Sequence, residues 1–423
     1  MELANNASGA LVLAILLGGT VLRSRFPSVP LWSIMMLCTS VTLLLNLVGL
    51  DEAMSYVDLD VIMLLIGMFS LVGMAERSGL LEFIAYSMIS RFRSLSSLVM
   101  GSSVLFGLMA AFFVNDTVAL MGPPIAVILG KAIGNYQLAF LLLCYSITVG
   151  SVMTPIGNPQ NMLIALKSGI DSPFIEFMLR LSIPTLISLV LVGWIMMRAY
   201  RLTNRPVAIA LSPWESVSSR REFVMVSIGG LLTFMALIVN DLLAALGYPH
   251  IESRGLIPFV AAAMIWPFTR SPREVLARVD FGTILFFIGM FVTVEGIWRS
   301  GILTPLFSLI HAQDVTTPVG LFYLSFVSFI MSQLVSNVPY ANLAVQQLTS
   351  LGVSSGDVQV WLTLAVTSTL AGNLTIIGAA SNVIVLEVLE SRYGASLSYV
   401  KFLKLGSVVT LCSFVVYVPF LLI

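Results

Sequence analysis

The chain has 423 residues and a formal net charge of zero, and its composition is that of a membrane protein. Hydrophobic residues make up 58% of it and charged residues 10%, whereas soluble domains have about 45–50% and about 25%. A mean hydropathy of +1.00 leaves too few polar side chains to cover a surface in water. These values exclude a soluble enzyme, and the balanced charge gives no electrostatic case for nucleic acid as a partner.

Ten apolar segments are expected to cross the lipid bilayer, because a crossing needs about 20 apolar residues, or fewer where protein covers the ends. The first is read as a span and not as a cleaved signal peptide, since its basic residues follow the apolar stretch. The ten segments lie at 8–22, 29–50, 60–76, 137–166, 175–199, 222–243, 255–269, 282–298, 357–387 and 399–422.

Two further apolar stretches are interrupted by polar and helix-breaking residues. Residues 97–133 contain VNDTVALMGPP, and residues 318–350 contain VSNVPYANL. Broken backbone at membrane depth is tolerated only where protein or water surrounds it, so each stretch is interpreted as a re-entrant hairpin. The expected fold class is an all-α polytopic membrane protein with about ten transmembrane helices and two re-entrant hairpins.

The positions of the basic residues predict the orientation of the chain. If the N-terminus lies outside, all Lys and Arg residues except four fall on the inner side, as the positive-inside rule requires. Both termini are therefore predicted outside. The four exceptions are Lys167, Arg180, Arg254 and Arg299.

An internal repeat organises the sequence. With an offset of 222, residues 57–81 align with 279–303, and 12 of the 25 positions are identical. The same offset places Asn115 on Asn337, at the tips of the two hairpins. Similar composition of apolar helices could produce the first match alone, but not several matches in the same order.

The repeat divides the chain into two halves of opposite orientation. With the offset reduced by one, TPIGNPQN (154–161) aligns with TIIGAASN (375–382). The expected units are a first inverted repeat (1–200), a cytoplasmic linker (201–221) and a second inverted repeat (222–423), each repeat with one hairpin. Five crossings per half turn the second half upside down. Inverted repeats with broken helices are typical of transporters that bind substrate near the bilayer midplane.

The candidate binding residues come from four polar clusters at the hairpin tips and helix breaks. An unpaired polar group in hydrocarbon costs several kcal/mol, so such clusters line water, a ligand or an ion, or act as helix caps. Exposed helix N-termini favour an anion, while freed carbonyls and Asn oxygens suit a small cation. The predicted substrate- or ion-binding residues are Asn115, Asp116, Thr117, Thr154, Gly157, Asn158, Asn161, Ser336, Asn337, Thr375, Gly378, Ser381 and Asn382.

Two carboxylates are candidates for coupling. Asp116 is the only carboxylate in the four clusters, and it is interpreted either as the proton or cation coupling group or as a cap of the hairpin helix. Glu295 aligns with Gly73 within a span, and is interpreted either as a second titrating group or as a residue paired with a local partner.

The sequence gives no pattern for catalysis or for a bound cofactor. Cys38, Cys144 and Cys412 lie far apart in apolar runs, which argues against a metal site or disulfide framework. The chain has no GxxxxGK[ST] loop for ATP, and no HExxH or GxSxG motif. We expect no enzymatic activity, no cofactor, and no metal other than a transported Na⁺.

Four motifs carry a resemblance to the ion transporter superfamily, which includes arsenical pump membrane proteins, NhaD-type sodium/proton antiporters, citrate transporters and divalent-anion/sodium symporters. The chain is most similar to the ArsB/NhaD branch, and within it to bacterial inner-membrane permeases of the YbiR type. The motifs are, in order, FFVNDTVALMGPPIAV, GSVMTPIGNPQNMLIALKSG, SQLVSNVPYANLAV and GNLTIIGAASNVIVLE.

The resemblance implies a scaffold domain and a hairpin-bearing transport domain in the cell inner membrane, commonly as a homodimer. It assigns ion or substrate contacts to Asn115, Asn161, Asn337 and Asn382. In the dicarboxylate members both tips read Ser-Asn-Thr. Here the tips read Val-Asn-Asp and Ser-Asn-Val, which argues against a dicarboxylate.

The predicted function is secondary active transport of an inorganic or small organic anion, arsenite-like or carboxylate-like, coupled to H⁺ or a cation. Alternating access would occur at the two hairpin tips. Two alternatives are a Na⁺/H⁺ antiporter, with Asp116 exchanging the cations, and a passive channel subunit that works with a separate ATPase.

Overall fold

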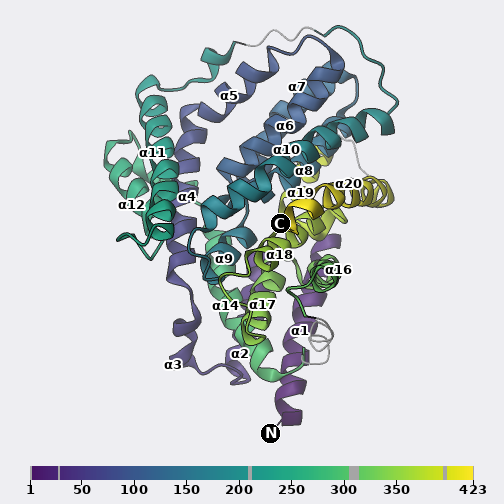
Figure 1. Ribbon diagram of the computed structural model, residues 1–423. Coiled ribbons are helices and arrows are strands. Elements are labelled where there is room, and N and C mark those ends of the chain that lie inside the picture. The colour runs from purple at the N-terminus through teal and green to yellow at the C-terminus, as the bar shows by residue number, and fades with distance from the viewer. Residues whose placement is uncertain (1, 27–28, 208–211, 304–313, 394–397, 423) are drawn as a thin grey trace.

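The computed structural model describes residues 2–26, 29–207, 212–303, 314–393 and 398–422 (Figure 1). These residues contain no strand, and their β-type pairing is a single bridge between Ser94 and Pro206. The expected all-α polytopic fold is confirmed.

The first half and the linker contain α1 (Glu2–Arg25), α2 (Leu31–Leu44), α3 (Leu50–Ala53), η1 (Met54–Tyr56), α4 (Leu59–Ser78), α5 (Leu80–Ile89), α6 (Leu95–Phe113), α7 (Asn115–Ile133), α8 (Tyr136–Gly150), η2 (Ser151–Met153), η3 (Pro155–Gly157), α9 (Pro159–Lys167), α10 (Pro173–Ala199) and η4 (Pro213–Ser216). The second half contains α11 (Arg220–Ala245), α12 (Leu256–Ile265), η5 (Trp266–Phe268), α13 (Pro272–Ala277), α14 (Phe281–Ser300), α16 (Pro318–Val335), α17 (Asn337–Ser350), α18 (Val358–Leu370), η7 (Ala371–Asn373), η8 (Ile376–Gly378), α19 (Ala380–Tyr393) and α20 (Tyr399–Leu421).

Helix length does not separate spans from hairpin arms in this fold. Among the described residues, nine helices are long and apolar enough to cross a membrane. Three of these, α6, α7 and α16, are arms of the predicted hairpins. Shorter apolar segments occur in α1, α2 and α12, which correspond to predicted crossings. The predicted spans 137–166 and 357–387 are each interrupted near the middle, as the sequence suggested.

The helices divide into a scaffold group and a hairpin group, whose members correspond between the two repeats. In the scaffold group, α11 and α12 pack against α4, while α1 and α2 pack against α14. The hairpin group consists of α6 to α10 and α16 to α20. Within it, α7 contacts α19 and α17 contacts α9, so each hairpin packs against the interrupted helix of the other half. This exchange brings the two polar hairpin tips into one region.

A pair of glycines allows close helix crossings within the scaffold group. A Cβ on Gly67 of α4 would lie 2.4 Å from the backbone of Phe259 in α12. A Cβ on Gly289 of α14 would lie 2.6 Å from Oγ1 of Thr39 in α2. The two glycines occupy the same position of the repeated IGMF segment. Both repeats therefore share this contact between helices as well as the sequence. A larger residue in place of either glycine would force the crossing helices apart.

The helix bounds follow the offset found in the sequence. α4 and α14 differ by 222 at both ends, and the hairpin turns fall at Val114 and Ser336. The short 3-10 helices η3 and η8 differ by 221. These correspondences support the proposed pair of repeats.

Each of the four basic residues predicted on the outer side is paired with a carboxylate. The pairs are Lys167–Asp58 at 3.8 Å, Arg180–Glu176 at 2.9 Å, Arg254–Asp241 at 2.9 Å and Arg299–Glu52 at 2.9 Å. Such pairs lower the cost of placing basic side chains at or near membrane depth.

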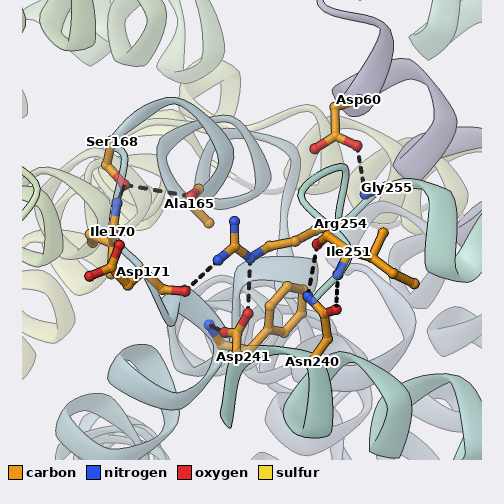
Figure 2. Close-up of polar contacts among 11 residues, drawn as sticks. Asp60, Ala165, Ser168, Ile170, Asp171, Asn240, Asp241, Ile251, Arg254 and Gly255 are labelled. Atoms are coloured by element: carbon orange, nitrogen blue, oxygen red, sulfur yellow. Dashed lines mark hydrogen bonds and ion pairs between the residues drawn. The ribbon is translucent and has the colours of Figure 1, made fainter. Parts of the chain in front are cut away.

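A buried ion pair joins the start of α10 to the scaffold group (Figure 2). The side chain of Asp241, on α11, is fully buried and accepts from Nε of Arg254 at 2.9 Å and from the backbone N–H of Phe174 at 2.6 Å. Arg254 also donates to the carbonyl of Asp171, in the loop between α9 and α10. Asp241 thus caps α10 from a neighbouring helix and holds that loop in place.

We predict that Asp241→Ala lowers the free energy of unfolding by about 3–5 kcal/mol, because it leaves the guanidinium of Arg254 without its buried partner. Thermal or denaturant unfolding of the purified protein in detergent measures the change. Glu252→Ala, which removes an exposed carboxylate from the neighbouring loop, is the control and should change stability by less than about 0.5 kcal/mol. Equal stability of the two variants would contradict the structural role of the pair.

Candidate functional site

Both interrupted helices break at a threonine in extended conformation. Thr154 has φ −133° and ψ 157°, and Thr375 has φ −133° and ψ 156°. A short 3-10 turn follows each threonine and ends in Gly157 or Gly378. The interruption frees backbone carbonyls and N–H groups inside the protein, and these groups need partners.

Two asparagines supply those partners in the same way in both halves. The amide of Asn161 donates to the carbonyls of Ser151 and Thr154, at 3.2 and 3.4 Å. The amide of Asn382 donates to the carbonyls of Gly372 and Thr375, at 2.7 and 3.5 Å. The paired asparagines therefore hold the breaks open, which is the capping interpretation of their role.

The same threonines tie each break to the adjacent hairpin. Oγ1 of Thr154 donates to the carbonyl of Ala111 in α6, and Oγ1 of Thr375 donates to Oε1 of Gln333 in α16 at 2.7 Å. Ala111 and Gln333 are separated by the repeat offset of 222. Hairpin and broken helix are thus fixed to one another near the tip.

The hairpin tips have unusual backbone conformations. Val114 has φ +64° and ψ 129°, and Ser336 has φ +74° and ψ 155°, in a region that L-residues rarely occupy. Such conformations cost about 1–3 kcal/mol each and persist where the surrounding structure enforces them. Neither residue caps the following helix with its side chain, so the first turns of α7 and α17 keep N–H groups for another partner.

A cavity of about 260 Å³ lies between the hairpin group and the scaffold group. The N-terminal ends of four helices reach it: α7, α9, α17 and α19. The residues that these ends contribute are Asn115, Asp116, Thr117, Pro159, Gln160, Asn337, Val338 and Ala380. The opposite wall comes from α2, α4 and the start of α14. Four helix N-termini, each carrying partial positive charge, therefore border one space.

Four charged residues line the cavity: Glu76, Asp116, Arg278 and Asp280. Glu76 accepts an ion pair from Arg278 at 2.6 Å, at the ends of α4 and α13. Asp280 caps α14 by accepting from the backbone N–H of Thr283 at 2.9 Å. Asp116 is the carboxylate that lies among the helix N-termini, in the first turn of α7.

Buried amide oxygens without a hydrogen-bond partner mark both tips. Asn115 and Asn337 are each 6% exposed, and Oδ1 of each has no partner. In the second half, Oδ1 of Asn382 and Oγ of Ser381 are also buried without one. Buried polar atoms in native structures nearly always have a partner, so these oxygens indicate room for an ion, water or ligand.

The structure brings some of the predicted residues together at the cavity and places others behind its wall. Those lining it are Asn115, Asp116, Thr117, Ser336, Asn337 and Gly378. Those in the supporting layer are Thr154, Gly157, Asn158, Asn161, Thr375, Ser381 and Asn382. Glu295 is not part of the cavity lining, and its carboxylate pairs with Arg299 at 2.8 Å. The interpretation of Glu295 as a residue with a local partner fits this geometry.

Sequence reasoning missed two threonines. Thr148 and Thr369 both line the cavity and differ by the offset of 221, so the repeat alignment contained a signal for them. Thr369 donates to Oδ1 of Asn161 at 3.2 Å and accepts from Nδ2 of Asn158 at 3.2 Å. This threonine thus links the two broken helices. Arg278 and Glu76 gave no sequence signal, since they lie at the ends of α13 and α4 and outside the four polar clusters.

The part of the chain that the structure describes holds no cluster of three or more His, Cys, Asp or Glu residues arranged to bind a metal ion. Cys38 and Cys144 are buried and free. The cavity lining offers amide, hydroxyl, carboxylate and guanidinium groups together with helix termini.

The fold and the cavity define a class: a multi-pass membrane transporter that takes a small ion or anion. The chain matches the citrate transporter family (CitMHS) over residues 11–371 and belongs to it. This match confirms the resemblance to the ion transporter superfamily.

Several relatives are named as transporters or membrane proteins. Uncharacterized transporter Rv2684 of Mycobacterium tuberculosis is 29% identical over 380 residues, covering 84% of each chain. Silicon efflux transporter LSI3 of Oryza sativa is 25% identical, covering 86% of this chain and 87% of its own. Inner membrane protein YbiR of Escherichia coli is 27% identical, covering 67% and 70%. The YdaH transporter of Alcanivorax borkumensis has a similar fold, with a TM-score of 0.58 at 15% identity, covering 88% and 86%.

We predict that Gly157→Ala disrupts the first helix break. The new Cβ would lie 2.2 Å from the carbonyl oxygen of Ser151, which accepts from Asn158 and Asn161, so the turn has to shift. Thermal unfolding should show a loss of stability of about 1–3 kcal/mol. Gly18→Ala is the control, because its Cβ meets nothing within 4 Å. An unchanged stability of Gly157→Ala would show that the break tolerates a side chain.

Proposed function

We propose that the protein is a secondary active transporter of a small anion, inorganic or carboxylate-like, coupled to H⁺ or a cation. The observation that carries the proposal is the convergence of four helix N-termini on one cavity. Dipole ends and free N–H groups bind anions without a permanent positive charge, which allows release as well as binding.

The size and the charges of the cavity support a small substrate. Its volume of about 260 Å³ is below the 300–1,000 Å³ typical of pockets for drug-sized ligands. Arg278 is already paired with Glu76, so the helix termini provide the free positive potential. An inorganic oxyanion or a short carboxylate suits such a site.

Asp116 provides a physical basis for coupling. An ionised carboxylate in the first turn of α7 repels an anion that binds the same helix end, whereas a proton or bound cation removes the repulsion. Anion binding and cation binding therefore favour one another. The unpartnered oxygens of Asn115 and Asn337 are suitable ligands for a small cation beside it.

The route of transport follows from the proposed repeats. In the predicted orientation the cavity faces the cytoplasm, because Glu76 and Arg278 lie at the inner ends of their helices. Because the two repeats are inverted, each could adopt the conformation of the other. That exchange would close the site to the cytoplasm and open it to the opposite side. A homodimer is proposed on the family resemblance.

A Na⁺/H⁺ antiporter is the second candidate. It is favoured by the same juxtaposition of Asp116 with buried amide oxygens at both tips, which together could hold either cation. A passive channel working with a separate ATPase is the remaining alternative, and it requires neither coupling nor a titrating residue.

We expect Asp116→Asn to abolish coupling while leaving the fold intact. In proteoliposomes loaded with a pH-sensitive dye, wild-type protein should move protons when arsenite, citrate or succinate is added on one side. The variant should reduce that proton movement by about 5- to 150-fold, the range of typical coupling free energies. Asp51→Asn, which changes an exposed aspartate in the first turn of α3, is the matched control.

Other outcomes decide between the candidates. Proton movement driven by Na⁺ or Li⁺ alone, and lost in Asp116→Asn, would establish the antiporter and refute the anion carrier. Anion flux without proton or cation movement, equal in the variant and the wild type, would indicate a channel and reduce Asp116 to a helix cap.

A further inference from the structure

A second polar site lies on the side of the molecule away from the cavity. It is a shallow depression between the end of α9, the end of α17 and the scaffold helices α4 and α14. Its lining includes Asp58, Lys167, Glu295 and Trp298, together with Val345 and neighbouring residues of α17. The proposed anion site does not use any of these residues.

Lys167, the last residue of α9, is the centre of this depression. Its Nζ lies 3.8 Å from Oδ2 of Asp58 and 4.5 Å from the ring centroid of Phe291. The Lys167 and Asp58 side chains are 25% and 24% exposed. The negative charge of Glu295 also acts on the ammonium group, although its carboxylate bonds to Arg299. Lys167 therefore has anionic and aromatic partners in a largely desolvated setting.

The contacts of Lys167 connect the two helix groups. α9 belongs to the hairpin group, whereas Asp58 precedes α4 and Phe291 and Glu295 belong to α14. Asp58 is itself fixed, because Oδ1 caps α4 by accepting from the N–H groups of Asp60 and Val61. An ion pair anchored in this way resists separation of α9 from the scaffold group.

The repeat relates this depression to the cavity. Each of four residues around Lys167 has a partner 222 positions away that lines the cavity. The pairs are Asp58 with Asp280, Phe291 with Phe69, Glu295 with Gly73 and Trp298 with Glu76. The depression is thus the counterpart of the cavity in the other repeat, and an ion pair between the two helix groups lies beside it.

We propose that Lys167, through Asp58 and Glu295, is the latch that closes the substrate passage on the side opposite the cavity. The proposal rests on the alternating-access part of the proposed function. Breaking the latch removes an attraction that exists in only one of the two states, so the population shifts toward the state open at the depression. The shift is about two- to tenfold, the range for a pair between full exposure and full burial.

Cysteine accessibility tests the latch. In a background with Cys38, Cys144 and Cys412 replaced by Ala, Val345→Cys probes the depression and Val338→Cys probes the cavity. Both probes are on α17, and Val345 is 4% exposed in this state. Labelling by a membrane-impermeant thiol reagent is followed in lipid nanodiscs, where both faces are in contact with solvent.

We expect Lys167→Gln to speed labelling at position 345 about two- to tenfold and to slow it at position 338. Lys131→Gln, at an exposed lysine of α7, should leave both rates unchanged. Asp58→Asn, which keeps a capping side chain for α4 but removes the charge, should act in the same direction as Lys167→Gln.

Unchanged labelling at position 345 in both Lys167→Gln and Asp58→Asn would overturn the assignment. Acceleration at both probes together would also refute it, because that result indicates general loosening of the fold. These measurements need neither substrate nor an ion gradient. Failure of the latch is therefore distinguishable from failure of the anion carrier, which is judged from flux alone.

Discussion

The rest of this structure depends on one constraint: backbone broken inside a bilayer needs hydrogen-bond partners from the protein itself. Both breaks meet it with an asparagine that donates back to carbonyls released by the break, Asn161 in the first half and Asn382 in the second. A threonine at each break then bonds to the neighbouring hairpin. Because the breaks are stable, the helix termini that follow them can face a cavity instead of pairing with one another.

Both halves contain the same kind of helix break, but the polar groups at the two breaks have hydrogen-bond partners to different extents. In the first half, Asn158 bonds to Ser151 and to Thr369 of the other half, and Oδ1 of Asn161 accepts from Thr369. In the second half an alanine stands where Asn158 stands in the first, and the oxygens of Ser381 and Asn382 lack partners. The first break is a closed polar network, while the second has unused acceptors. A cation that binds through oxygen ligands would find more of them in the second half.

Two ion pairs hold basic side chains at the cavity and at the depression. Arg278 is paired with Glu76 at one edge of the cavity, and Lys167 is paired with Asp58 at the other side of the molecule. Between them, Asp116 lies among helix N-termini whose partial positive charges stabilise a carboxylate. A net change of one proton or one cation at Asp116 therefore alters the potential of the whole cavity, which is what coupled transport requires.

The sequence by itself determined the fold class, the two hairpins and the offset of the repeat, because membrane crossings need long apolar runs and polar breaks are conspicuous within them. It also pointed to Asn115, Asp116 and Asn337 at the tips. Only the tertiary structure separated the residues that line the cavity from those that hold the breaks, such as Asn161. It also placed Glu295 beside Arg299 and away from the cavity lining, and revealed the partners of Lys167. Hydrogen bonds and ion pairs between distant segments depend on how α9, α14 and α17 pack, and no local pattern encodes that packing.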